Sequence, residues 1–220
     1  SELGQALSTL PGSTGMYAMA FIALGFAMKA AMLPLRIDMW MHPATAPTPV
    51  SGYISSVLLK TGPFGLMKLF FVIGGAGFFA GKSGYWAQPA IMYTLAWVAG
   101  IAIFYAALKA VMQTSIKRVL IYSTVSQMAY VLLGICMATP LTVSGGLMHF
   151  VNHMFFKNLL FLAAGAIMYR THADTLDELS GIGRKMPFTL TVFAIAAFSA
   201  VGIPPLSGFT SKWMLYHGLM

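Results

Sequence analysis

Residues 149–169, HFVNHMFFKNLLFLAAGAIMY, have the composition of a membrane-spanning helix, yet the stretch begins with two imidazoles and an ammonium group. His149, His153 and Lys157 follow one another at intervals of four residues. On an α-helix this spacing places the three side chains on one face, about 6 Å apart along the axis. The stretch therefore predicts a transmembrane helix that carries a row of ionisable groups.

The composition of the whole chain supports a helical membrane protein. Of its 220 residues, 58% are hydrophobic and only 8% are charged, whereas soluble domains carry about 25% charged residues. The apolar runs are near 20 residues long and do not alternate, which favours helices. The net charge of +8 does not indicate a nucleic-acid partner, because several lysines fall inside apolar spans. The single cysteine, Cys136, excludes a disulfide within the chain.

We expect an all-α bundle of about six transmembrane helices, with residues 1–220 forming a single transmembrane region. The predicted spans are 15–33, 48–80, 88–113, 118–138, 142–169 and 187–218. The second is too long for one straight helix, so we predict a kink at Gly62–Pro63. Loops after the first, third and fifth spans carry six Lys or Arg residues, whereas those after the second and fourth carry only Lys82. By the positive-inside rule, residues 170–186 form a cytoplasmic loop of a multi-pass protein of the inner (plasma) membrane.

Prolines interrupt the first and the last span near a lysine. Pro34 follows Lys29 closely, and a second group of helix-breaking residues precedes Lys212. These residues are Pro204, Pro205 and Gly208. A proline removes a backbone donor and leaves carbonyls that lipid cannot satisfy, so a broken span must be surrounded by protein or water. Two interrupted spans in corresponding positions indicate a transport pathway.

Four lysines lie well within the apolar spans, and each opposes insertion by about 2.5–3.5 kcal/mol. They are Lys29, Lys60, Lys157 and Lys212. The HxxxH pair beside Lys157 permits three interpretations. It could bind zinc or haem, but no carboxylate or thiolate is placed to complete a zinc site, and Lys157 would repel a cation. The histidines could instead join neighbouring helices by hydrogen bonds.

The third interpretation, which we favour, is a proton relay. Imidazoles exchange protons near neutral pH, and desolvated lysines can do so as well. The three groups on 149–157 extend over about 12 Å, a large part of the hydrocarbon core. The sequence predicts a relay without a metal site, a bound cofactor or a catalytic centre in this chain. Its candidate members are Lys29, Lys60, His149, His153, Lys157 and Lys212.

Several motifs resemble those of a known family. They are KAAMLPL (29–35), APTPVSGYISSVLLKTG (46–62), QTSIKRVLIYSTVSQMAYVLLG (113–134), HFVNHMFFKNLLFLAAGAI (149–167) and GIPPLSGFTSKW (202–213). In their order they resemble the antiporter-like membrane subunits of respiratory complex I, membrane-bound hydrogenases and Mrp-type sodium/proton antiporters. The stretch PLRIDMWMHPATAPTPV (34–50) departs from the usual family pattern, because the acidic residue before Ala-Pro-Thr-Pro is absent.

The resemblance implies the seventh to twelfth helices of a larger inverted-repeat fold, whose two ends are the broken pair. It assigns Lys29 to the seventh-helix lysine position, and Lys60 to that of the eighth-helix lysine or a neighbouring histidine. It assigns His149, His153 and Lys157 to the eleventh helix and Lys212 to the twelfth. The family's fifth-helix glutamate has no counterpart in this sequence.

The function implied by the resemblance is proton translocation within a redox-driven complex. Its partners would be lipid, other membrane subunits, and peripheral subunits that carry iron–sulfur clusters. An Mrp-type antiporter that exchanges sodium for protons and an inert structural membrane subunit are the alternatives. Copurification with iron–sulfur subunits favours the first function, and sodium-dependent proton exchange favours the second.

Overall fold

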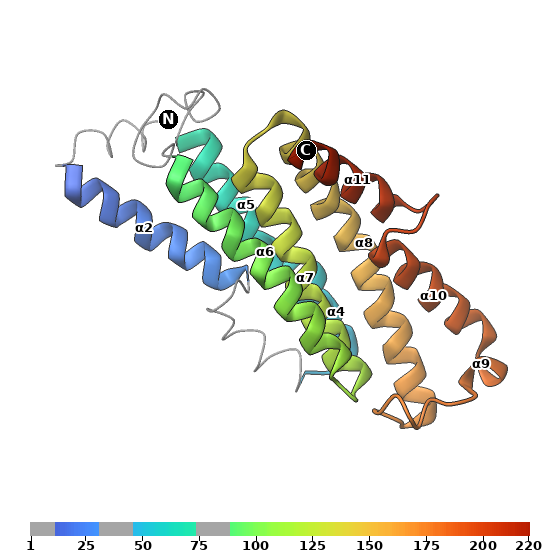
Figure 1. Cartoon of the computed structure of the whole chain (residues 1–220). Helices are drawn as coiled ribbons and strands as arrows, with labels where there is room; N and C mark the ends of the chain where they lie inside the picture. Colours follow the sequence, from blue (N-terminus) through green and yellow to red (C-terminus); the bar gives the residue numbers. More distant parts are fainter. Residues whose placement is uncertain (1–11, 31–45, 74–88) are drawn as a thin grey trace.

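The computed structural model describes residues 12–30, 46–73 and 89–220, and this part of the chain is almost entirely helical (Figure 1). The helices before the second gap are α2 (Gly12–Lys29), α4 (Thr48–Ser56), η1 (Leu58–Lys60), α5 (Thr61–Met67) and η2 (Lys68–Ile73). Those after it are α6 (Pro89–Val111), α7 (Ile116–Met137), α8 (Pro140–Thr171), α9 (Ile182–Lys185), α10 (Pro187–Val201) and α11 (Ser207–Leu219). The predicted all-α fold class is confirmed.

Four helical stretches in the described ranges are long and apolar enough to cross a membrane. They are Thr48–Phe71, Tyr93–Val111, Ile116–Met137 and Pro140–Thr171, and the shorter apolar helices are Ala20–Lys29 and Pro187–Val201. The four long stretches coincide with the second to fifth predicted spans. The shorter helices belong to the first and last spans, for which the sequence predicts interruptions.

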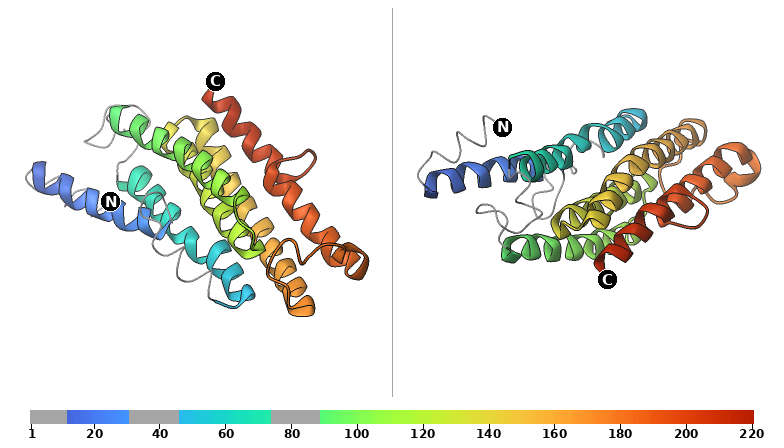
Figure 2. Two further views of the ribbon diagram at one scale, coloured as in Figure 1. Left: turned by 60° about the horizontal axis from the view of Figure 1, so that its bottom comes forward. Right: turned by 90° about the horizontal axis from the view of Figure 1, so that it is seen from above.

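Helix α8 is the centre of the bundle, because it contacts α4, α7, α10 and α11. The view from above shows α4 and α5 on one side of α8 and α10 and α11 on another (Figure 2). A capping box starts α8. The hydroxyl of Thr139 accepts a hydrogen bond from the backbone N–H of Thr142, and the hydroxyl of Thr142 accepts one from the backbone N–H of Thr139. The helix ends where His172 adopts a left-handed conformation with φ 55°.

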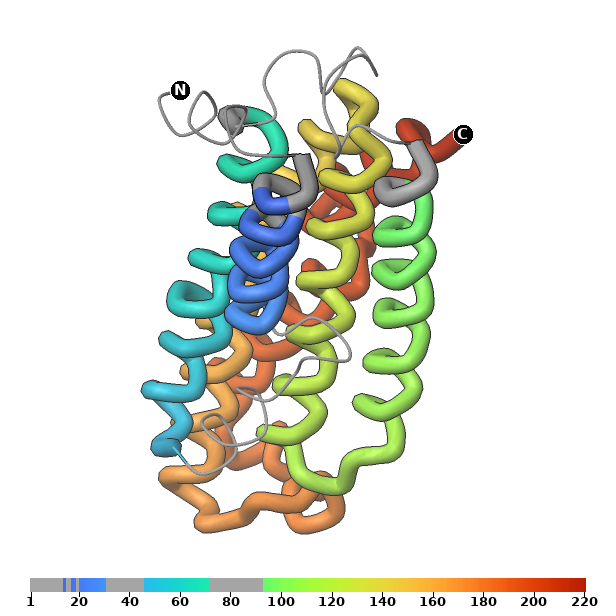
Figure 3. Tube along the Cα trace, turned by 90° about the vertical axis from the view of Figure 1, so that its left-hand side faces the viewer, coloured from blue at the N-terminus to red at the C-terminus, as the bar shows by residue number. Residues whose placement is uncertain are grey.

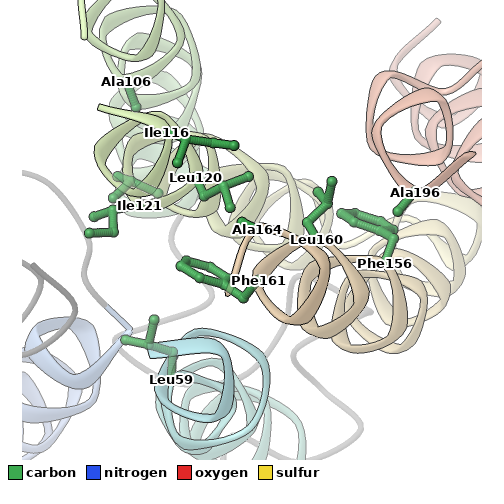
Figure 4. Packing of buried hydrophobic residues seen from close by; sticks show 11 residues of the cluster. Leu59, Ala106, Ile116, Leu120, Ile121, Phe156, Leu160, Phe161, Ala164 and Ala196 are labelled. Carbon is green, nitrogen blue, oxygen red and sulfur yellow. The ribbon is translucent and has the colours of Figure 1, made fainter. Parts of the chain in front are cut away.

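A buried apolar cluster holds α8 against its neighbours on the side of the bundle shown in Figure 4. Phe156, Leu160 and Phe161 of α8 pack with Leu120 of α7 and Ala196 of α10. Phe161 is fully buried. These contacts fix the rotation of α8 about its axis, and therefore which side the histidines face.

The predicted kink of the second span is present, but it lies before Gly62–Pro63. The α-helix is interrupted at η1, and α5 begins at Thr61, so Pro63 lies in the first turn of a new helix. A proline there loses no intrahelical bond, but in a continuous helix its ring would clash with the carbonyl of Leu59, four residues earlier. The irregular turn therefore forms around that carbonyl.

The last span breaks between Val201 and Ser207, as its prolines predict. Gly202 ends α10 with φ 93°, a conformation that favours glycine. Gly208 is not part of the break, in contrast to our prediction. It lies in the first turn of α11, where a Cβ would collide with the backbone of Ser199, so it permits α10 and α11 to approach closely. The predicted break at Pro34 lies outside the described residues.

The turn after α6 and the loop after α8 lie at the same end of the bundle (Figure 3). The backbone N–H of Leu176 donates to the carbonyl of Thr114 (2.9 Å), and that of Ile116 donates to the carbonyl of Asp174 (3.3 Å). The ammonium group of Lys117 donates to the carbonyl of Ala46 at the start of α4. This end therefore gathers the loops to which the sequence assigns most Lys and Arg residues, while its cytoplasmic location stays a prediction.

Candidate functional site: a buried row of lysines and histidines

The three ionisable residues of α8 share one face, and all three are completely buried. His149, His153 and Lys157 each have a relative exposure of 0%. Lys60, which is 4% exposed, reaches the same region from η1. The structure thus brings four of the six predicted relay residues into the interior of the bundle.

Lys60 and His153 form a direct contact between η1 and α8. The Lys60 Nζ atom lies 2.6 Å from His153 Nδ1, and it also lies 3.3 Å from the Met128 sulfur and 3.4 Å from the carbonyl oxygen of Ser55. An ammonium group can only donate, so a charged Lys60 requires Nδ1 to accept and the ring proton to be on Nε2. His153 Nε2 is buried and has no hydrogen-bond partner among the described residues.

His149 is bound on both of its ring nitrogens. Its Nε2 lies 2.9 Å from the side-chain oxygen of Gln127 on α7, and its Nδ1 lies 3.0 Å from the hydroxyl of Ser211 on α11. Since the Gln127 oxygen only accepts, Nε2 carries a proton. The single proton of the Ser211 hydroxyl is shared between His149 Nδ1 and the carbonyl oxygen of Gly208, which lies 3.1 Å from that hydroxyl. The centroids of the His149 and His153 rings are 6.5 Å apart.

Lys157 lies one helical turn beyond His153 and is bound to α7. Its ammonium group donates to the carbonyl oxygen of Leu120 at 2.9 Å and to the hydroxyl of Ser123. The Thr124 hydroxyl donates to the same Leu120 carbonyl at 2.9 Å. The Ser123 hydroxyl and the Leu120 carbonyl therefore solvate this buried ammonium group.

Lys212 is half-buried and uses the break between α10 and α11. Its Nζ atom donates to the carbonyl oxygens of Ala200 (2.7 Å) and Val201 (3.1 Å), two of the groups that the end of α10 leaves unpaired. It also lies 5.0 Å from the centroid of the Tyr130 ring, which in turn lies 5.8 Å from that of His149. The broken helix thus positions a lysine close to the buried histidines.

Lys29 is not part of this cluster. It is the last residue of α2, its side chain is exposed, and no described contact joins it to His149, His153 or Lys157. Helix α2 packs against α5, where Gly62 and Gly65 leave room for the Phe26 segment. The structure therefore brings together five of the six predicted relay residues and leaves Lys29 apart.

Four polar residues of the site were not among those singled out from the sequence. They contact the ionisable groups from α7 and α11, and they are Ser123, Gln127, Tyr130 and Ser211. Gln127 could have been identified from the sequence, because an amide side chain within an apolar span needs a hydrogen-bond partner. Its partner, however, becomes visible only when α7 is placed against α8.

The described site contains cationic and neutral groups but no carboxylate. The only acidic residues within the described ranges are Asp174, Asp177 and Glu178, and all three belong to the loop after α8. No group of three His, Cys, Asp or Glu side chains in those ranges could hold a metal ion. The ionisable side chains that the described structure gathers at this site are therefore those of lysine and histidine.

Comparisons with known proteins identify the family. The family model described as "NADH:quinone oxidoreductase/Mrp antiporter, TM" matches residues 2–220. NADH-quinone oxidoreductase subunit N of Desulforudis audaxviator is 32% identical over 206 residues, which cover 92% of this chain and 39% of that protein. Hydrogenase-4 component B of Escherichia coli is 32% identical over 230 residues, which cover 98% of this chain and 32% of that protein.

Solved structures show the same fold. A chain of the Mrp complex from Dietzia sp. DQ12-45-1b has a TM-score of 0.84 at 27% identity, covering 94% of this chain and 36% of that chain. A chain of an archaeal membrane-bound sulfane sulfur reductase has a TM-score of 0.86 at 22% identity, covering 98% and 43%. This chain thus spans about a third to two fifths of the length of the proteins it matches. Since the family match covers nearly every residue, the chain is a multi-pass membrane protein that belongs to the NADH:quinone oxidoreductase/Mrp antiporter transmembrane family.

Proposed function

We propose that this chain carries protons through the membrane along the buried row of Lys60, His153, His149 and Lys212, with Lys157 as a further exchange site. The observation that supports this most directly is the distance of 2.6 Å between Lys60 Nζ and His153 Nδ1. Both groups can gain and lose a proton, and both are buried. A proton can therefore pass between them without a bulk-water intermediate.

Two steps of the route differ in what they require. The ring centroids of His153 and His149 are 6.5 Å apart, so transfer between them needs a side-chain rotation or a bridging water. From His149 the Ser211 hydroxyl leads to α11, where the next residue in the chain is Lys212. Ring and hydroxyl rotation at these steps would set the rate of transfer.

Protons suit this site better than sodium ions. Sodium is a hard cation and, like calcium and magnesium, is bound by oxygen ligands, most strongly by carboxylates. The described helices offer no carboxylate, and the five lysine and histidine side chains gathered at the site would repel a metal ion. Cation/proton antiport is the second candidate, because the chain is 27% identical to a chain of an Mrp complex over 94% of its length.

We further propose that the chain works as one membrane subunit of a larger complex. Relatives named as a subunit of NADH-quinone oxidoreductase and as a component of hydrogenase-4 support this assignment. In this proposal peripheral iron–sulfur subunits supply the redox energy. The chain itself binds no cofactor and moves the ion.

Substitutions of Lys157 test its role as a further exchange site for protons. Lys157→Met keeps the length of the side chain but removes its charge and its proton, and Lys157→Arg keeps the charge but does not release a proton at accessible pH. In the reconstituted complex, we expect both substitutions to lower proton translocation by roughly 10²-fold or more, as loss of a proton-transfer group does in enzymes. Translocation at the parental rate by Lys157→Met would refute the role of Lys157 as an exchange site and leave it a structural polar contact.

Sodium dependence distinguishes the two candidate functions. The unmodified complex is assayed in sodium-free potassium buffer and again with added sodium. Proton transport that needs an electron donor and is indifferent to sodium supports the redox-driven pump. Transport that needs sodium and proceeds without an electron donor supports antiport.

A further inference from the structure

A cavity of about 520 Å³ lies where α8 ends and α10 begins, outside the row of lysines and histidines. Its size is within the range of small-molecule sites. Among the residues that line it are Arg170, the penultimate residue of α8, Glu178, and Lys185 and Met186 just before α10. The cavity therefore brings charged groups of both signs to the end of a transmembrane helix.

The length of α8 places this cavity at the level of lipid headgroups. The helix has 32 residues, so it is about 48 Å long and exceeds the hydrocarbon core, which is about 30 Å thick. With the helix centred in the bilayer, Arg170 lies about 22 Å from the midplane, just outside the hydrocarbon. Phospholipid phosphates occupy this depth.

Two exposed aromatic residues lie close in sequence to residues that line the cavity. Tyr169 precedes Arg170 and is 85% exposed, and Phe188 is the second residue of α10 and is 81% exposed. Exposed aromatic residues at the ends of transmembrane helices are typical of the membrane–water boundary. Their exposure is consistent with a headgroup-level location of the chain segments that line the cavity.

The cavity is not purely basic, because Glu178 is a counter-charge to Arg170 and Lys185. One carboxylate oxygen of Glu178 accepts from the backbone N–H groups of Asp174 (3.1 Å) and Thr175 (3.2 Å). The hydrogen bonds from Thr175, followed by that from Asp174, lower the pKa of Glu178, so the carboxylate is charged at neutral pH. A ligand of this cavity should therefore carry both a negative and a positive group.

We propose that the cavity binds the headgroup of a zwitterionic phospholipid with a primary ammonium group, namely phosphatidylethanolamine. Arg170 and Lys185 bind the phosphate, and Glu178 accepts hydrogen bonds from the ammonium group. An anionic lipid such as phosphatidylglycerol satisfies the two cations but leaves Glu178 opposite a negative headgroup. Free phosphate makes the same contacts with the cations but gains nothing from the aromatic residues or the membrane.

The experiment measures lipid binding to the full-length protein in its complex by native mass spectrometry, after delipidation and titration with defined lipids. We expect phosphatidylethanolamine to bind more tightly than phosphatidylglycerol. The double substitution Arg170→Gln/Lys185→Gln should weaken this binding at least about tenfold, because charge-assisted hydrogen bonds to the phosphate are lost. Arg184→Gln is the matched control, since Arg184 is exposed on the same segment but does not line the cavity, and it should change binding less than twofold.

Glu178→Gln tests the ammonium contact by itself. It should reduce the preference for phosphatidylethanolamine over phosphatidylglycerol and leave the phosphate contacts in place. Three results would overturn the proposal: unchanged binding by the double variant, equal binding of both lipids by the unmodified protein, or inorganic phosphate that displaces the lipid at equal concentration. Because the readout is lipid binding, it is independent of proton translocation.

Discussion

Replacement of Lys60 by methionine should separate the stability of the bundle from proton transfer. The ammonium group of a buried lysine opposes membrane insertion by about 2.5–3.5 kcal/mol, and Lys60→Met relieves this penalty. The same substitution leaves His153 Nδ1 without the partner that lies 2.6 Å away, which costs about 1–3 kcal/mol for a buried acceptor. The two effects oppose each other, so the net change lies between about 0.5 kcal/mol of destabilisation and about 2.5 kcal/mol of stabilisation.

We therefore expect the Lys60→Met complex to assemble normally and to fail in transport. Proton flux should fall roughly 10²–10⁴-fold, because the group that exchanges a proton with His153 is gone. Lys60→Arg keeps a positive charge beside His153 but holds its proton at accessible pH, so it should also fail.

The assay is proton uptake into proteoliposomes that contain the assembled complex, followed with an entrapped pH indicator. Subunit composition is verified first by size-exclusion chromatography, so that a loss of transport is not a loss of assembly. Transport at the parental rate by Lys60→Met would refute the relay. Parental transport by Lys60→Arg alone would show that Lys60 acts through its charge and not through its proton.

Three further predictions concern packing, pH and topology. Gly134→Ala should lower the stability of the bundle by about 1–3 kcal/mol in thermal unfolding, because the new Cβ would lie 2.6 Å from the backbone oxygen of Thr142. Gly100→Ala is the control, because its new Cβ would meet no neighbouring helix or side chain within 4 Å, and it should stabilise α6 by up to about 1 kcal/mol. Because the pKa of Glu178 is lowered, the stability that its carboxylate gives to the loop is fully present above the usual carboxyl pKa and is lost as pH falls through the folded-state pKa. Hydrogen exchange of residues 172–181, corrected for intrinsic rates, should therefore become faster in acid. In Glu178→Gln this pH dependence should disappear. Thr175→Cys should resist an impermeant thiol reagent in intact cells and react after permeabilisation, and labelling from outside would reverse the predicted orientation.

The sequence by itself determined which segments are membrane helices. Lipid cannot hydrogen-bond the backbone, so every long apolar run must satisfy its own backbone groups as a helix, whatever its neighbours are. The third to fifth predicted spans accordingly match helical stretches within a few residues, and the second matches from its start to Phe71, while its predicted end at residue 80 lies outside the described residues. Local chemistry also determined the break before Lys212 and the common face of His149, His153 and Lys157, because both follow from residues close together in the chain.

Only the tertiary structure decided which ionisable groups meet. Lys60 and His153 are 93 residues apart, and Gln127 reaches His149 from a third helix. Such contacts depend on the rotation of each helix about its axis, which is set by packing such as that of Phe161. The apolar composition of a span does not encode this rotation, because lipid and protein neighbours are equally apolar. For the same reason the sequence does not distinguish Lys29 from the buried lysines, although Lys29 is exposed on α2 and lies apart from them.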